Sequence, residues 1–255
     1  MNADGHGTGR GLVLAAAILV AAATVATPAY GQAGGDGYLF KTPVVTLGMK
    51  AGYAVPRAGS EIFAFTRDEL TIERSDFNSA TLVGDISVRV SERVDLTLQA
   101  GFSKSETRSE FREWVDQDDL PIEQVTSFHR LPLTLGVKAY LRDRGRSIGR
   151  FAWVPTDWNA YAGAAGGFTW YEFEQVGDFV DFETLDIFPD RFYSDGRAPT
   201  LQLFGGFEYA LNPTFLLTAE GRYGWAEAEM GRDFVGFDAM DLAGFQATAG
   251  ISARF

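Results

Sequence analysis

Apolar residues occupy every second position in eight separate stretches of this chain, with small or polar residues between them. In the final stretch one face holds Phe245, Ala247, Ala249, Ile251, Ala253 and Phe255, and the other holds Gly244, Gln246, Thr248, Gly250, Ser252 and Arg254. Similar alternation runs over about 44–53, 82–90, 94–103, 130–141, 160–171, 201–209 and 215–225. A period of two is that of a β-strand, so the pattern predicts eight strands.

The bulk of the side chains indicates which face of each strand points outward. Leu, Phe, Tyr and Trp crowd one face, whereas Gly, Ser and Thr dilute the other. A narrow eight-stranded barrel has room inside for the smaller set only. In 160–171 Gly and Ala occur on both faces, and there we place Phe168 and Trp170 outward. The predicted fold is all-β, an eight-stranded antiparallel up-and-down transmembrane β-barrel.

The predicted connections alternate in length. The turns around 91–93 and 211–214 are short, and 142–158 is a longer link. The other four connections, about 54–79, 104–127, 172–199 and 227–241, are predicted to be long loops. Short periplasmic turns and long extracellular loops are typical of bacterial outer-membrane barrels.

The N-terminal segment predicts export. Arg10 precedes an apolar run over 12–26 and a small-residue stretch over 27–33, the pattern of a secretory signal peptide. We therefore expect a cleaved signal peptide at 1–33 and a barrel domain at 34–255, located in the bacterial outer membrane. The chain has no cysteine, which excludes a lipoprotein anchor and disulfide bonds.

Two short motifs resemble those of a known family. They are Gly205-Gly206-Phe207-Glu208-Tyr209-Ala210-Leu211-Asn212-Pro213, a strand that turns at Asn-Pro, and Gly250-Ile251-Ser252-Ala253-Arg254-Phe255. Both are similar to motifs of the small eight-stranded outer-membrane barrels of the OmpA and OmpX type. The resemblance implies an OmpA-like, porin-like barrel over about 38–255, and that Phe255 is an assembly signal. No peptidoglycan-binding domain is expected after it.

The acidic balance changes the picture of partners. The formal net charge is −12, which argues against nucleic acid as a ligand. Each predicted long loop is acidic, with net charges from −2 to −6, and aromatic residues are interleaved with the carboxylates. Such loops either pack on their own aromatic residues over the barrel mouth or form a recognition surface.

Charged residues also fall on the predicted inward face. They form a candidate lumenal charge network of Lys50, Asp85, Arg89, Arg130, Lys138, Glu208, Glu220 and Arg222, with Asp95 and Arg254 on the same face. Buried charges of mixed sign must pair, so this network predicts a polar, plugged lumen. The sequence favours Arg222 as the partner of Glu208. The alternative for this network is a gated ion path.

The sequence offers no convincing catalytic or metal-binding constellation. His129 lies near Ser127 at the outer end of its strand, the only candidate left for general base chemistry once His6 is removed with the signal peptide. No His or Cys cluster has metal-ligand spacing. Gly163-Ala164-Ala165-Gly166-Gly167 is followed by no predicted helix, so we interpret it as a thin part of the wall rather than a phosphate cradle. We expect no cofactor.

The link at 142–158 is basic. Its arginines are Arg142, Arg144, Arg146 and Arg150, and we expect them to contact anionic headgroups of the inner leaflet. The alternative is a solvated turn with no partner.

Together these features predict a monomeric, non-enzymatic outer-membrane barrel with a structural or surface-interaction role at the cell surface. Its expected partners are outer-membrane lipids, the barrel-assembly machinery during insertion, and an extracellular ligand of unknown identity. The alternatives are a small transport barrel for ions or apolar compounds, or a lipid-modifying enzyme.

Overall fold

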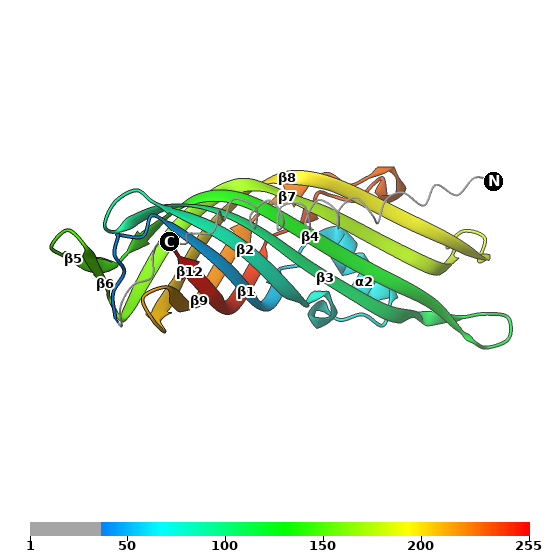
Figure 1. Cartoon of the computed structure of the whole chain (residues 1–255). Coiled ribbons are helices and arrows are strands. Elements are labelled where there is room, and N and C mark those ends of the chain that lie inside the picture. The colour runs from blue at the N-terminus through cyan, green and yellow to red at the C-terminus, as the bar shows by residue number, and fades with distance from the viewer. Residues whose placement is uncertain (1–36) are drawn as a thin grey trace, which may run out of the picture.

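Eight strands close into a barrel in the computed structural model, which describes residues 37–255; the predicted signal peptide at 1–33 lies outside this range. The strands are β1 (Val45–Pro56), β2 (Ser79–Arg89), β3 (Val94–Val115), β4 (Pro121–Tyr140), β7 (Trp158–Val180), β8 (Ile187–Ala210), β9 (Phe215–Trp225) and β12 (Gly244–Arg254). Each pairs antiparallel with its neighbours in the chain, and β12 pairs with β1 to close the ring (Figure 1). The predicted fold class is confirmed.

The outer surface of the barrel is apolar. Met49, Leu82, Leu135, Leu201 and Ile251 each expose more than half of their surface, the reverse of a soluble barrel. Outward aromatic residues lie near both ends of the wall. They are Tyr53, Phe168, Trp170, Tyr223, Trp225 and Phe245 near one end, and Trp158, Phe207, Tyr209 and Phe215 near the other. From Phe215 to Trp225 the strand runs about 33 Å, or roughly 25 Å along the axis of a tilted barrel.

An apolar belt of this height between two aromatic girdles is that of a membrane barrel. Among residues 37–255, no helix is both long and apolar enough to cross a membrane.

Half of the wall continues far beyond the membrane. The strands β1, β2, β9 and β12 have 11 or 12 residues, whereas β3, β4, β7 and β8 have 20 to 24. These four neighbours form one extended sheet on one side of the molecule (Figure 1). The predicted loops at 104–127 and 172–199 are therefore wrong over most of their length, since both ranges consist mainly of paired strand.

The concave face of the extended sheet is covered by a hydrophobic cap. The cap contains α2 (Glu61–Glu69), the 3-10 turns η1 (Arg74–Phe77) and η2 (Arg232–Phe234), and the short hairpin of β10 (Glu227–Ala228) and β11 (Met240–Asp241). Phe63 of α2 is fully buried and meets the rings of Phe77, Phe128 and Phe173 edge to face. The loop aromatic residues thus pack into a core above the barrel mouth.

The opposite end of the barrel carries the short connections. There the link between β4 and β7 forms a hairpin of β5 (Gly145–Ile148) and β6 (Ala152–Pro155) that projects past the barrel end (Figure 1). Leu39 pairs with Trp153 of β6 through two backbone hydrogen bonds, and both side chains are buried. The short turns mark this end as periplasmic.

The glycines of β7 allow a crowded lumen. The strand points Tyr161, Ala165 and Thr169 inward and Phe168 outward, in the phase that we predicted for Phe168. A Cβ on Gly163 would lie 2.4 Å from the Phe204 ring, so the missing side chain makes room for that ring. This fits the interpretation of Gly163–Gly167 as a thin part of the wall.

Candidate functional site

The half of the lumen nearer the cap holds a network centred on Glu220 of β9. Lys50 of β1 lies 3.1 Å from Asp85 of β2 and 3.2 Å from Glu220. Arg222 pairs with the other oxygen of Glu220 at 3.0 Å and donates to Gln202 and Gln99. Each charged group of this network therefore has an opposite charge beside it.

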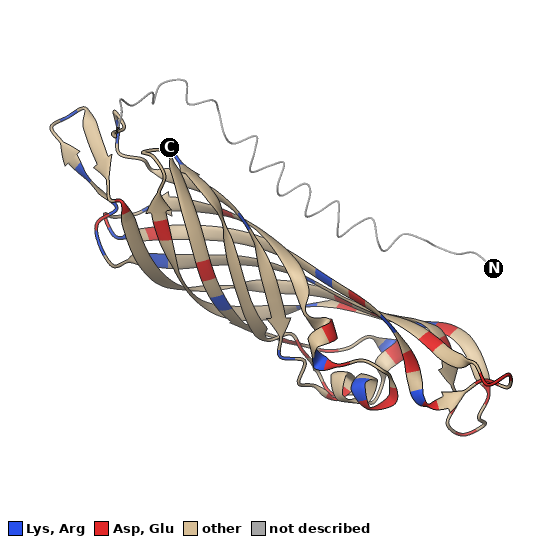
Figure 2. Ribbon diagram, turned by 90° about the horizontal axis from the view of Figure 1, so that it is seen from below, with Lys and Arg blue, Asp and Glu red and all other residues tan. Residues whose placement is uncertain are grey.

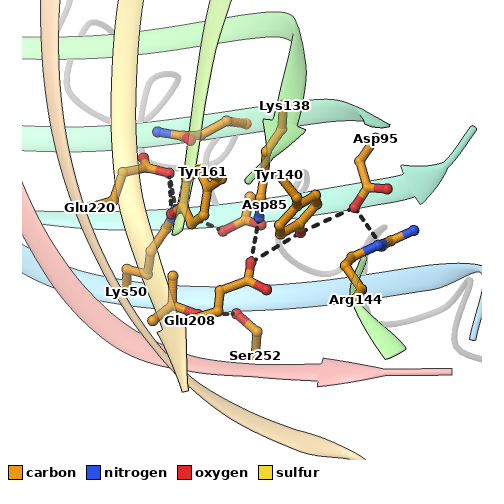
Figure 3. A network of polar contacts seen from close by, with 12 residues as sticks. Lys50, Asp85, Asp95, Lys138, Tyr140, Arg144, Tyr161, Glu208, Glu220 and Ser252 are labelled. Atoms are coloured by element: carbon orange, nitrogen blue, oxygen red, sulfur yellow. Dashed lines mark hydrogen bonds and ion pairs between the residues drawn. The ribbon is translucent and has the colours of Figure 1, made fainter. Parts of the chain in front are cut away.

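The half of the lumen nearer the periplasmic end holds a second network, which joins the strands β3, β4 and β8 and the link before β5 (Figure 3). Lys138 of β4 donates to Glu208 of β8 at 2.6 Å. The Tyr140 hydroxyl lies 3.1 Å from Glu208 and 3.2 Å from Asp95 of β3. Arg144, from the link before β5, reaches up into the barrel and pairs with Asp95 at 2.7 Å. Asp95 is completely buried, so Arg144 compensates a charge that would otherwise be strongly unfavourable.

The expected pairing of Glu208 with Arg222 is wrong. Glu208 lies opposite Thr218, and Arg222 lies opposite Phe204, four residues further along the hairpin. The Arg222 guanidinium covers the Phe204 ring at 4.3 Å instead. Glu208 is matched by Lys138, which reaches it past the intervening strand β7.

Two further arginines of the predicted network lie outside both groups. Arg89 pairs with Glu92 in the turn between β2 and β3. Arg130 lies under the cap, where it covers the Phe128 ring and donates a long hydrogen bond of 3.5 Å to the Leu242 carbonyl. Sequence reasoning placed Arg144 in the periplasmic turn, because no periodicity in a link shows which residue folds back inward.

The lumen has little free space. Within the described part of the chain, one cavity of about 50 Å³ lies under the cap and one of about 10 Å³ lies at the periplasmic end. The smaller one is lined by Arg144, Trp153, Glu208 and Arg254. Since a single water needs about 10–15 Å³, neither volume is a continuous channel.

The four arginines of the basic link have different environments. Arg144 is buried in the lumen, and Arg142 stacks on Trp158 at 4.0 Å. Arg146 and Arg150 are exposed near the tip of the β5–β6 hairpin, beside the exposed Ile148 and Phe151. Lipid contact by this link stays a prediction, and the buried Arg144 is not free to make it. The role of Phe255 in assembly also stays a prediction; its backbone pairs with Val45 and its ring is partly exposed.

His129 lies on the outer face of the sheet just above the membrane belt. Its neighbours in adjacent strands are Lys104 and Glu172, and its Nδ1 lies 3.6 Å from a Glu172 oxygen. Burial lowers the pKa of His129, and burial raises the pKa of Glu172. Within the described residues Ser127 makes no hydrogen bond to His129, and no group of three His, Cys, Asp or Glu side chains is arranged to hold a metal.

The far end of the extended sheet forms an acidic and apolar tip. We define the tip as residues 113–120 and 181–190, the ends of the β3–β4 and β7–β8 hairpins. Leu120 and Leu185 are 56% and 59% exposed, and Val115 and Phe182 are also more than half exposed. The Trp114 and Phe182 rings meet edge to face at 6.2 Å, which joins the two hairpin ends.

Carboxylates surround these apolar side chains, and neither tip segment contains a Lys or Arg (Figure 2). They are Glu113, Asp116, Asp118, Asp119, Asp181, Glu183, Asp186 and Asp190. Backbone N–H groups of Glu183 and Thr184 donate to Asp181 and lower its pKa. Residues 113–120 and 181–190 thus present a strongly negative surface.

No protein-family profile matches this sequence, and no curated protein matches it. Among solved structures, the chain is similar to the outer membrane protein OprG from Pseudomonas aeruginosa, with 14% identity over 84% of this chain and 97% of that one and a TM-score of 0.47. It is similar to Neisserial surface protein A (12% identity, 83% and 97% covered, TM-score 0.43). It is also similar to Ail, the attachment invasion locus protein of Yersinia pestis (10% identity, 87% and 100% covered, TM-score 0.41).

The closed ring of eight strands, its apolar exterior and its aromatic girdles make this chain a bacterial outer-membrane β-barrel that crosses the membrane by strands.

Proposed function

We propose that this protein is a non-enzymatic outer-membrane barrel that anchors a rigid extracellular sheet, and that the tip of this sheet binds a cationic, partly apolar protein segment. The observation that carries the proposal is the tip itself, where exposed apolar side chains stand among carboxylates. Exposed apolar groups with a polar surround are typical of interaction sites.

The scaffold beneath the tip supports a binding role. Beyond the barrel, β7 and β8 continue for about ten residues, which carries the tip roughly 30 Å past the membrane belt. The cap packs its aromatic core against this extension and holds it firm. A surface held rigidly away from the membrane loses little conformational entropy when a partner binds.

The charge of the tip selects the partner. A negatively charged surface repels anionic polymers and attracts cationic ones, and the attraction accelerates encounter. Apolar side chains among the charges then favour a partner that carries both basic and apolar residues.

The transport alternative has less support. The lumen is filled by paired charges, the tyrosines that contact them and the Phe204 ring, and its cavities are small and separate. An apolar compound would meet buried charged groups on this route. The arrangement around His129 likewise gives the enzyme alternative no nucleophile–base pair.

The test measures binding of the refolded protein in detergent to an immobilised synthetic peptide of alternating Lys and Leu, with a Glu–Leu peptide as the reference surface. Wild type should bind the basic peptide, more weakly as salt increases. Two tip variants should lose binding at least tenfold. One is Leu120→Ser with Phe182→Ser and Leu185→Ser, and the other is Asp118→Asn with Asp119→Asn and Glu183→Gln.

Val235→Ser is the matched control, because Val235 is exposed on the cap and lies outside the tip. If the tip variants bind the basic peptide as well as wild type and the control do, the tip is not the binding surface.

A further inference from the structure

The charges inside the barrel do not balance. Four inward carboxylates, Asp85, Asp95, Glu208 and Glu220, are each within 4 Å of a cation. The cations that match them are Lys50, Lys138, Arg144 and Arg222. Arg130 and Arg254 also point inward, and among residues 37–255 neither has a carboxylate within that distance.

Each unmatched arginine lines a cavity. Arg130 lines the cavity of about 50 Å³ under the cap, and Arg254 lines the cavity of about 10 Å³ at the periplasmic end. The smaller volume suits one water. The larger one has room for an ion, and Arg130 is the unmatched arginine that lines it.

Asp241 of the cap does not form an ion pair with Arg130. Asp241 lies close to it in the cap, but one Asp241 oxygen accepts from Arg57 and from the Gly59 backbone, and the other accepts from the Ala243 backbone. Asp241 and Arg57 already form a neutral pair at 2.7 Å. The positive charge of Arg130 is therefore left over.

Polar groups complete the lining of the cavity. Ser103 and Thr169 are about 95% buried, both line the cavity, and their hydroxyls make no hydrogen bond to other described residues. Arg222 lies on another wall, but Glu220 matches its charge. The cavity thus offers one uncompensated positive charge and free hydroxyl donors.

We propose that this cavity is a binding site for one small monovalent anion, of the size of chloride or bromide. Arg130 is partly buried under the cap, and a guanidinium that has lost much of its water without gaining a counter-charge is unfavourable, so an anion beside it offsets that penalty. The single excess charge favours a monovalent ion. The volume excludes a bulky organic anion such as gluconate.

The first test is direct. Crystals of the refolded protein are soaked in sodium bromide, and anomalous scattering locates the bromide. A peak next to Arg130 that is missing in Arg130→Met supports the proposal. No peak in the cavity, or an equal peak in Arg130→Met, overturns it.

The second test needs no crystals. Thermal unfolding in detergent is followed while chloride replaces gluconate at constant ionic strength, because a ligand that binds only the folded state raises Tm. Wild type should show a saturable rise, and so should the control Arg108→Met, whose side chain is 73% exposed on the outer face. Arg130→Met should show none. A rise of the same size in Arg130→Met, or no rise in wild type, contradicts the site; if Arg130→Met does not fold, the bromide peak in wild type decides.

Discussion

At the scale of single residues, the buried ion pair of Lys138 and Glu208 is the central contact of the network near the periplasmic end of the lumen. Both side chains are at least nine-tenths buried, and Tyr140 supports Glu208 with a hydrogen bond. Glu208→Ala leaves Lys138 with an uncompensated buried charge, so we expect a loss of about 3–5 kcal/mol in the free energy of unfolding. The measurement is urea unfolding of the refolded protein in detergent micelles.

The partner of Glu208 can be identified by a double-mutant cycle. Lys138→Met combined with Glu208→Ala should recover much of the loss, because the two groups contact each other. Arg222→Ala with Glu208→Ala is the control pair and should be close to additive. Additivity for Lys138 together with coupling for Arg222 would restore the pairing expected from sequence.

The expected pair, Glu208 with Arg222, and the observed pair, Glu208 with Lys138, show how far alternation along the strands predicts contacts inside the barrel. Alternation places Glu208, Lys138 and Arg222 on the inward face, because period two fixes the face of every strand residue. It does not fix which inward residues meet across a barrel. The strand β7 lies between Lys138 and Glu208, and the residue of β7 opposite Lys138 is Gly163, which has no side chain in the way. The pattern of β4 or of β8 alone therefore does not show that these two side chains meet.

At the scale of elements, the cap is a folding unit laid on the extended sheet. We expect Phe63→Ala to destabilise it by about 3–5 kcal/mol, the usual range for a buried Phe. Hydrogen exchange should speed up over α2 and over 226–243, while the eight strands of the wall keep their protection. Phe65→Ala is the control on the same helix, since Phe65 is 40% exposed. Uniform loosening of the cap and the barrel would show that they do not unfold separately.

The extension of the sheet was not predicted, although the sequence carries a signal for it. Lys104, Glu106, Arg108 and Glu110 alternate with small hydroxyl residues that face the cap. Here charged residues alternate with small ones at the spacing of a strand, whereas we predicted strands from the alternation of apolar residues. Above the membrane the outer face of a strand meets water instead of lipid. Charged side chains therefore replace apolar ones on that face, while the period of two residues remains.

At the scale of the whole molecule, charge is divided between compartments. The extracellular tip and cap are acidic, whereas the lumen carries two more cations than carboxylates among its inward strand and link residues. Eight strands and their faces follow from the sequence, because each wall residue meets either lipid or a tight lumen. Packing of the loop aromatic residues over the barrel mouth was one of the two alternatives that the sequence offered. The contacts inside the cap and the tip do not follow from the sequence, because they join segments that are far apart in the chain.

Single-channel recording tests the central claim, that the barrel is a plugged anchor rather than a conduit. Refolded wild-type protein is inserted into a planar bilayer in 1 M KCl, and insertion is verified by heat modifiability of the recovered protein. We predict no stable conductance steps for wild type. We predict steps for a variant that truncates both networks, Lys138→Ser and Glu208→Ser combined with Glu220→Ser and Arg222→Ser. Regular ohmic steps from wild type, equal to those of the variant, would contradict it and establish a transport barrel.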